Sequence, residues 1–431
     1  MVKDSYTLKM KEGSLKISFV TLKDCIKIVG TVFDRDTVFE KVEIPSSING
    51  INVGVIAGET FAYLKTKLFI LPRTKCKLCK KALSRLIAEK VIWPRVINAI
   101  PERCFEFAVI NKIEFENVNA IKSIGQYAFF HTVQLEHVEW PAKIKIIPAY
   151  CFADSQITSI SGHDDVEIIM EGAFEGTNIT EFDFKKVKML DKGAFKSCEK
   201  LKKVTLPIDC TSIGAECFSM CKGLEEITNT EQLKAIGTMA FFSTNIKEFV
   251  WPSAVTCIPS KCFYYTELNK ITGINSVTSI LDGAFCYSKL SEIELPSGLK
   301  KVGSDAFSST NLSKITFPAD CTSLASCVLF NCSELEEVRI EAPSFVEIFT
   351  DSFLGTPKEV VLSIPNAETV LLISPIQKNA RYNYVVKSLA TKNGILVEIL
   401  DLSAAGMGSK YIKSIKFLLQ TSFDAEVVFE D

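Results

Sequence analysis

Apolar residues recur along this chain at a nearly constant interval. Short elements ending in a large apolar residue, such as Gly193-Ala194-Phe195 and Gly283-Ala284-Phe285, place that residue at positions 61, 83, 105, 129, 152, 174, 195, 218, 241, 263, 285, 307, 329 and 353. The steps between these positions, here called anchors, run from 21 to 24 residues, and twelve of the fourteen anchors are Phe. A fixed period of this length is typical of stacked supersecondary units, so the chain is predicted to form a solenoid.

The residues around each anchor test the period independently. The residue five places before the anchor is aliphatic in all fourteen repeats, from Ile56 in the first to Ile348 in the last. The residue directly before the anchor is usually small, as Ala173 and Cys217 are. Close packing near the axis of a stack requires small side chains there, because bulk would push neighbouring coils apart.

A short segment after each anchor alternates apolar and polar residues and often ends at Pro, as in the run Leu201, Val204, Leu206 and Pro207. This alternation predicts a half-buried strand, which Pro ends because it has no backbone N–H. No single unit buries its own apolar face, so the strands are expected to stack into one long parallel sheet. At about 4.8 Å per strand, the sheet would be on the order of 65 Å long.

These residues closely resemble the BspA-type leucine-rich repeat, as in the stretch from Leu290 to Phe307, LSEIELPSGLKKVGSDAF. The resemblance covers residues 44 to about 362, where Asn49-Gly50 in the opening repeat suits a type I′ hairpin turn. It implies an α/β-solenoid of leucine-rich-repeat type that is mostly β, with about fourteen coils, one parallel sheet and β-rich caps. It also implies a surface antigen, since family members are surface antigens of mucosal bacteria and parasitic protists implicated in adhesion to host matrix and cells.

The two ends of a solenoid need caps, because each end coil otherwise exposes apolar surface. Residues 1–43 are expected to form an N-terminal β cap, with alternating runs at Leu15-Ile17-Phe19 and Ile26-Ile28. The solenoid is assigned to residues 44–362, and residues 363–431 to a mixed β cap. Within this last region we expect strands at 370–373, 395–400 and 426–429 and a helix at 410–420.

Charge and the N-terminal sequence bear on partners and location. The 49 Lys and Arg residues nearly balance 51 Asp and Glu residues, for a net charge of −2. This balance argues against nucleic acid, which requires clustered positive charge, and no run approaches the roughly 20 apolar residues of a membrane span. Residues 1–20 contain no signal-peptide-like run, which predicts a cytoplasmic location, whereas the family resemblance implies the cell surface.

Few residues suggest chemistry, and no catalytic residue, metal or cofactor is predicted. Cys76-Lys77-Leu78-Cys79 has the spacing of half a zinc site, but no second pair follows and Leu78 falls on the buried aliphatic position. His163-Asp164-Asp165 could ligate a metal, yet it lies where a strand passes into a solvated turn. Gly406-Met407-Gly408-Ser409 lacks the third glycine of a phosphate loop. Most of the fifteen cysteines are interpreted as small buried thiols.

Two further repeat positions are assigned structural roles. Three residues after the anchor the chain favours Cys, Ser or Thr, which would form a ladder that satisfies turn backbone groups. Trp93, Trp140 and Trp251 all precede the strand-ending Pro, and they are predicted to fill the core rather than to bind a partner.

Outward-facing strand positions remain as the candidate binding surface, because solenoids bind partners through the exposed sheet face. The predicted partner-binding residues are Lys203, Thr205, Glu226, Thr228, Glu248, Lys270, Thr272, Glu292, Glu294, Lys314, Thr316 and Glu337. A structural interpretation competes with this one, because charged and Thr residues also keep a sheet soluble.

The leading functional hypothesis is a monomeric, non-catalytic scaffold that binds a protein or an extracellular-matrix-like macromolecule through these residues. An intracellular adaptor of the same fold is the first alternative. An enzyme with its site in residues 363–431 is the second.

Overall fold

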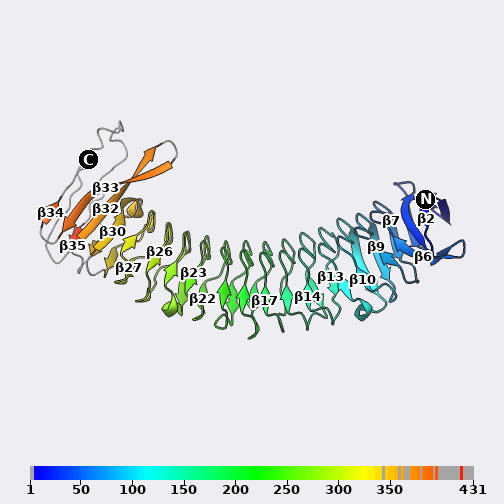
Figure 1. Cartoon of the computed structure of the whole chain (residues 1–431), viewed down its shortest axis with the longest axis horizontal. Helices are drawn as coiled ribbons and strands as arrows, with labels where there is room; N and C mark the ends of the chain where they lie inside the picture. Colours follow the sequence, from blue (N-terminus) through cyan, green and yellow to red (C-terminus); the bar gives the residue numbers. More distant parts are fainter. Residues whose placement is uncertain are drawn as a thin grey trace. The chain divides into compact units, whose positions relative to one another are not determined.

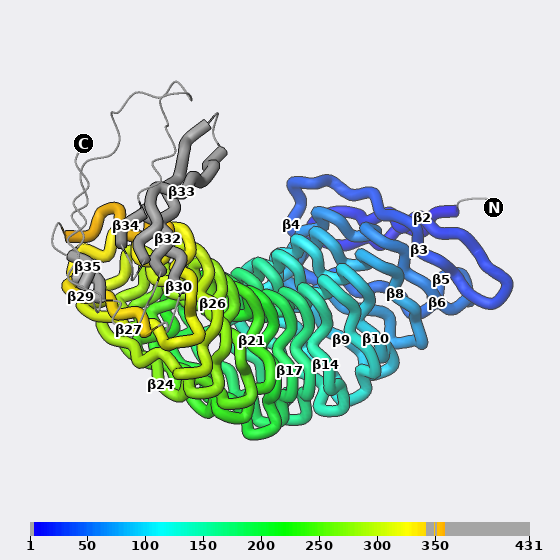
Figure 2. Tube along the Cα trace, turned by 60° about the vertical axis from the view of Figure 1, so that its left-hand side comes forward, coloured from blue at the N-terminus to red at the C-terminus, as the bar shows by residue number. Residues whose placement is uncertain are grey.

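The computed structural model describes residues 4–341, 345–357, 361–363, 369–378, 381–391, 394–396 and 418–420. The chain divides into two compact units, Met1–Leu224 and Glu225–Asp431. Within each unit, short coils stack side by side (Figures 1 and 2). The helical elements of the described residues are three 3-10 turns, η1 (Val118–Ala120), η2 (Ile274–Ser276) and η3 (Thr350–Phe353). The fold is therefore a mostly β solenoid, of about 13 turns.

The first unit begins with an antiparallel sheet that joins the first coil. Its strands are β1 (Asp4–Met10), β2 (Gly13–Thr21), β3 (Ile26–Val32), β5 (Ser47–Ile48), β6 (Ile51–Ile56) and β8 (Lys77–Leu78). β1, β2 and β3 pair antiparallel, with Phe19 opposite Ile28, and β3 pairs in parallel with β6. Asn49 and Gly50 both have positive φ where they join β5 to β6, as the Asn-Gly sequence predicted.

Two parallel ladders run through the first unit. The first ladder consists of the longer strands, most of which follow an anchor, and is here called the main sheet face. Its strands are β4 (Val38–Glu43), β7 (Lys65–Ile70), β9 (Ile87–Trp93), β11 (Val109–Phe115), β13 (His137–Glu139), β15 (Ser159–Ser161) and β18 (Lys203–Thr205). The second ladder contains β10 (Ala99–Ile100), β12 (Ser123–Ile124), β14 (Ile146–Ile147), β16 (Ile168–Ile169), β17 (Met189–Leu190) and β19 (Ser212–Ile213). The second ladder carries the aliphatic residue five places before each anchor. The predicted division at residues 43 and 362 remains a proposal, and β4 lies in the main sheet face although it precedes residue 44.

The second unit repeats this arrangement. Its main-face strands are β20 (Glu226–Thr228), β22 (Glu248–Val250), β24 (Lys270–Thr272), β27 (Lys314–Phe317), β29 (Glu337–Ile340), β31 (Val361–Ser363) and β35 (Leu418–Gln420). Its second ladder contains β21 (Ala235–Ile236), β23 (Cys257–Ile258), β25 (Ser279–Ile280), β26 (Lys301–Val302), β28 (Ser323–Leu324), β30 (Phe345–Phe349) and β32 (Thr369–Lys378). β33 (Arg381–Thr391) and β34 (Gly394–Leu396) continue from β32 with antiparallel pairing.

The main sheet face differs from the single continuous sheet that the sequence predicted. In the first unit no strand forms at residues 180–184, where Phe182 contacts the anchors Phe174 and Phe195 at ring centroid distances of 5.3 and 5.4 Å. In the second unit no strand forms at residues 291–296, where Ile293 is only half-buried. The main-face strands of the described residues therefore form several short parallel sheets.

The anchors form the core of each unit, as predicted. In the first unit the rings of Phe129, Phe152, Phe174 and Phe195 stack with centroids 5.1 to 5.3 Å apart and planes within 15°. In the second unit the rings of Phe263, Phe285 and Phe307 stack at 5.7 and 5.5 Å. Each of these side chains is 0% exposed, and Leu83 and Leu329 are equally buried at their anchor positions. The small residues before the anchors, such as Ala173 and Cys217, are also buried.

Backbone hydrogen bonds join each anchor turn to the next coil. The N–H groups of Tyr150, Phe152 and Asp154 donate to the carbonyls of Glu171, Ala173 and Glu175 at 2.8, 2.8 and 2.7 Å. The residues two before and two after the anchor have positive φ, with values of 53° at Tyr150 and 55° at Asp154. The left-handed conformation therefore recurs at non-glycine residues, and the bonds between coils accompany it.

The predicted polar ladder behind the anchors forms at Thr and Cys positions, whereas the buried hydroxyls of Ser155 and Ser288 have no hydrogen-bond partner among the described residues. Thr177 Oγ1 donates to the carbonyl of Phe174 at 2.9 Å, and Thr266 Oγ1 does the same to Phe263 at 2.8 Å. The Cys198 and Cys221 thiols donate to the carbonyls of Phe174 and Phe195 at 3.0 Å. These buried groups give a second donor to carbonyls that also accept a backbone N–H in the turn, as Phe174 does from Thr177 and Phe195 from Cys198.

Only part of the C-terminal region is described, so the structure tests only some of the elements predicted there. β32 includes the predicted strand at 370–373, and β34 includes the start of the one at 395–400. The predicted helix at 410–420 is wrong for its last three residues, which form β35 and pair in parallel with β31. Pairing with a neighbouring strand overrides the helical periodicity there. Residues 397–417 and 421–431, including Gly406-Met407-Gly408-Ser409 and the predicted strand at 426–429, lie outside the described residues.

Candidate functional site

The predicted sheet-face residues mostly lie on strands and point to solvent. Lys203 and Thr205 lie on β18 in the first unit. In the second unit, strands β20, β22, β24, β27 and β29 carry Glu226, Thr228, Glu248, Lys270, Thr272, Lys314, Thr316 and Glu337, and all but Thr228 and Glu337, which are half-buried, are exposed. Glu292 and Glu294 are exposed but belong to no strand, because residues 291–296 do not pair.

Opposite charges face each other along this surface of the second unit. Glu248 and Lys270 are direct neighbours in the β22–β24 register. Lys314 Nζ lies 3.4 Å from Glu337 Oε2, with the two side chains 64% and 38% exposed. Exposed pairs of this kind add little stability, because water and salt screen them. The surface thus offers both signs of charge to a partner instead of one dominant field.

A shallow groove opens beside the segment that does not pair in the second unit. Its volume is about 440 Å³, and the side chains of Ile293, Leu295, Ile315 and Pro318 give it an apolar floor. Glu294 and Lys314 also line it, so charged groups border the apolar surface. An apolar surface bordered by charged residues is typical of protein-binding sites.

The candidate metal motifs do not assemble into metal sites. No group of three His, Cys, Asp or Glu residues suited to a metal exists among the residues that the structure describes. Burial raises the pKa of the Cys76 thiol to about 12, which disfavours the thiolate that a metal would bind. His163 Nε2 lies 3.1 Å from the carbonyl of Asp183, and burial lowers the His163 pKa.

The cysteines and tryptophans have the structural roles that the sequence predicted. All fifteen cysteines are unpaired, and most of them are buried. Trp93, Trp140 and Trp251 are 1 to 2% exposed. Each indole N–H donates to the carbonyl four residues later, at 2.8, 2.9 and 2.8 Å. These residues fill the core, as the sequence predicted.

An ion-pair ladder in the first unit gives a pH prediction. Glu167 lies between Lys145 and Lys188, whose Nζ atoms are 2.6 and 2.7 Å from its carboxylate oxygens. Hydrogen bonds from both ammonium groups lower the Glu167 pKa from 4.5 to about 2. The ionised carboxylate therefore contributes its full stabilisation of the folded state above pH 4.5, and this contribution is lost as the pH falls toward 2.

We expect a carboxyl NMR titration of the folded chain to place the midpoint of the Glu167 titration near pH 2. Replacing both lysines by Met should return it toward 4.5, and a native midpoint already at 4.5 would contradict the ladder.

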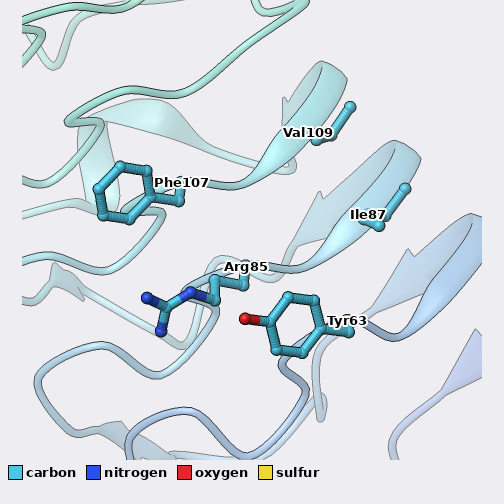
Figure 3. Close-up of a pocket in the computed structure, with 5 residues that line it drawn as sticks. All are labelled: Tyr63, Arg85, Ile87, Phe107 and Val109. Carbon is cyan, nitrogen blue, oxygen red and sulfur yellow. The ribbon is translucent and has the colours of Figure 1, made fainter. Parts of the chain in front are cut away.

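Sequence reasoning missed a second surface, in the first unit. Tyr63 and Phe107 are 46% and 40% exposed, and the Arg85 guanidinium carbon lies 5.9 and 5.6 Å from their ring centroids. Together with Ile87 and Val109 they line a hollow of about 290 Å³, in which the two rings flank the arginine (Figure 3). The available signal was the variation of the residue two places after the anchor, which is small or polar in several later coils, such as Gly176 and Ser197, but large in others, such as Tyr265 and Tyr287.

Stacked coils with buried anchors and an outward-facing parallel strand row define a leucine-rich-repeat solenoid. Proteins of this class are generally non-catalytic and suggest a protein-interaction scaffold. The chain belongs to the BspA type leucine rich repeat family, whose profile matches residues 26–157, 145–269 and 256–372. Among the described residues, no helix is long and apolar enough to cross a membrane.

One solved structure of a bacterial leucine-rich-repeat protein is similar in fold, and two others match with lower scores. A leucine-rich repeat protein from Bacteroides ovatus ATCC 8483 matches with a TM-score of 0.58 and 19% identity, over 84% of this chain and 95% of that one. The pneumococcal vaccine antigen PcpA matches at 0.42 and 15%, over 84% and 93% of the two chains. A leucine rich cell surface protein from Faecalibacterium prausnitzii A2-165 matches at 0.34 and 17%, over 84% and 89%. Comparison with curated proteins gives no match.

Proposed function

We propose that this chain is a non-catalytic scaffold that binds a protein or a matrix-like macromolecule through the exposed sheet face of its second unit. The observation that carries this proposal is the groove beside residues 291–296, where the half-buried side chains of Ile293, Leu295 and Pro318 line a hollow that Glu294 and Lys314 border. Burying apolar surface drives association, and the bordering charges select a partner of complementary pattern. The adhesion role that the family resemblance implies belongs to the same proposal.

Charge reversal on the sheet face tests the proposal. A partner is first isolated on the immobilised full chain, purified, and its affinity measured by surface plasmon resonance. We expect the triple variant Glu226→Lys, Glu248→Lys and Glu292→Lys to weaken that affinity about tenfold or more, and to reduce its salt dependence, because it removes three charges that a partner would read.

Matched reversals away from the sheet face provide the control. The exposed residues Glu267, Asp320 and Glu334 of the same unit, changed to Lys, alter net charge equally and should leave the affinity within about twofold. A partner that loses affinity for both triple variants alike responds to net charge. A partner that binds both variants like the original chain uses another surface, and the sheet-face proposal then fails.

Location separates the adhesin from the intracellular adaptor of the same fold. Surface biotinylation of intact cells labels an adhesin, whereas an adaptor is detected only in the lysate. The enzyme alternative concerns residues 363–431, which lie largely outside the described residues, and assays of a chain truncated after residue 362 address it separately.

A further inference from the structure

The second surface defines a patch of six residues in the first unit, here called the Tyr63 patch: Tyr63, Lys65, Arg85, Ile87, Phe107 and Val109. Its residues come from three successive coils, two and four places after the anchors at 61, 83 and 105. Lys65 pairs in register with Ile87, and Ile87 with Val109, at the first positions of β7, β9 and β11. Two rows of side chains therefore run across neighbouring coils, one aromatic and cationic, the other mostly aliphatic (Figure 3).

The repeat itself shows that the fold does not require these residues. The later coils with anchors at 129 and 218 keep larger residues, His131 and Met220, but the three coils between them have Asp154, Gly176 and Ser197 two places after the anchor. Four places after the anchor they have Gln156, Asn178 and Glu199. These coils stack with the same backbone hydrogen bonds as the coils of the patch. Large apolar side chains that are exposed where the fold accepts small polar ones indicate a binding role.

The charges of the Tyr63 patch favour an anionic group. Arg85 has an ion pair with Glu59, at 3.6 Å, and its side chain donates no hydrogen bond in the described part of the chain. Its planar fork of donors therefore remains available to a carboxylate. Lys65 has no ion-pair partner among the described residues, and the Arg35 guanidinium carbon lies 5.4 Å from the Tyr63 ring centroid. Arg85 and Lys65 thus lie within the patch and Arg35 lies beside it, and Glu59 pairs with Arg85.

The aliphatic row favours a peptide over a sugar or a nucleotide. Ile87 and Val109 offer no side-chain hydrogen bond, so hydroxyl groups buried against them would lose their bonds to water without replacement. Apolar peptide side chains bury there favourably. Two coil steps separate Tyr63 from Phe107, about 10 Å at the spacing of adjacent strands, which about three residues of extended peptide span.

We propose that the Tyr63 patch binds a short extended peptide segment in which an acidic side chain, held by Arg85, stands beside apolar or aromatic side chains. The aliphatic row of Ile87 and Val109 takes the apolar side chains. This site is independent of the sheet-face proposal, because its residues lie in the first unit and the charge reversals for the sheet face lie in the second.

A phage-displayed random heptapeptide library, selected on the immobilised full chain, supplies the probe. We expect the selected peptides to be enriched in Asp or Glu next to Leu, Ile, Phe, Tyr or Trp. Synthetic labelled copies are then measured by fluorescence anisotropy. Arg85→Glu should weaken their binding at least tenfold, and Arg85→Gln severalfold, because Gln loses the charge and the fork of donors but, unlike Glu, does not repel an acidic side chain.

Two sets of variants control for folding and net charge. Tyr63→Ser with Phe107→Ser installs the residue that Ser197 already provides at the equivalent position, so the fold is preserved while the rings are lost. Binding should fall at least tenfold, with unchanged thermal unfolding. Arg95→Glu changes an exposed arginine just beyond the opposite end of β9, and it should leave binding unchanged.

Three results would overturn the inference. The library could yield no binder, or binders that tolerate both Arg85→Glu and the double serine variant. Neutral glycan probes on an array could bind the chain and lose binding with the serine variant but not with Arg85→Glu, which would assign the patch to carbohydrate. The sheet-face variants act as a further control in the same assay, since peptides that lose binding to them instead would support only the other proposal.

Discussion

Replacing Phe174 by Ala is expected to lower the free energy of unfolding of the first unit by about 3 to 5 kcal/mol. The Phe174 side chain is 0% exposed, and its ring stacks between Phe152 and Phe195 at 5.3 and 5.1 Å. Truncation removes contacts on both faces of the ring and leaves a cavity between coils that the rigid stack cannot close. Urea unfolding followed by circular dichroism measures the loss.

Two variants make this result specific to the stacked ring. Phe174→Leu should cost clearly less than Phe174→Ala, because Leu83 and Leu329 fill the same position in their own coils. Phe107→Ala removes a ring that is 40% exposed and should cost about 1 kcal/mol or less. Equal losses for Phe107 and Phe174 would mean that the anchors are not the core of the unit.

Trp251→Ala is expected to destabilise the second unit by a similar amount, about 3 to 5 kcal/mol. The indole is 2% exposed, packs against Phe249 and Phe263, and donates its N–H to the Val255 carbonyl at 2.8 Å. Trp251→Phe keeps a ring but leaves that carbonyl without its donor, so a loss of about 1 to 3 kcal/mol is expected. The same denaturant titration measures both changes.

The neighbouring exposed position is the control for this prediction. Val250 is 45% exposed, and Val250→Thr introduces the residue that Thr272 provides next to it in register. Its effect should stay within about 0.5 kcal/mol. A Trp251→Ala loss as small as this would show that the indole is a surface residue available to a partner.

Much of the fold could be predicted because the repeat offers many independent tests of one register. From the anchor at 129 to the one at 329, the aliphatic residue five places before the anchor, the residue directly before it and the residue three places after it are all buried, as the period predicts. One ambiguous residue cannot shift a register that every other coil fixes. The tryptophans were predicted correctly for the same reason, since all three fall on one repeat position.

Other features depend on backbone geometry that the sequence does not encode plainly. Tyr150 and Asp154 have positive φ, a conformation in which glycine would be expected. Both residues donate a backbone hydrogen bond to the next coil in this conformation. The gaps in the main sheet face at residues 180–184 and 291–296 fall in segments whose apolar patterning is like that of the paired strands, so the patterning alone does not predict them. The predicted helix at 410–420 failed at its end because its residues pair with a distant strand.

The candidate sites were predicted unequally. The sheet-face residues follow from alternation along each strand, although Glu292 and Glu294 fall where no strand forms. The Tyr63 patch could have been predicted only by comparing the residues that different coils place at one repeat position. A search for the positions that all coils share passes over such differences. Exceptions to the repeat, such as Phe107 where Ser197 stands in a later coil, are the informative residues for function.

Backbone hydrogen bonds join consecutive anchor turns, with donors two before, at and two after the anchor in coils such as those of Phe152 and Phe263. These backbone hydrogen bonds form with the following turn whatever side chains that turn carries at its exposed positions. Mutational drift at the exposed turn positions therefore leaves assembly intact, and whole repeats can be duplicated or lost without redesigning the junction. A protein lineage built on this junction can change its length and its surface separately, so new binding specificities can evolve on a scaffold that keeps folding.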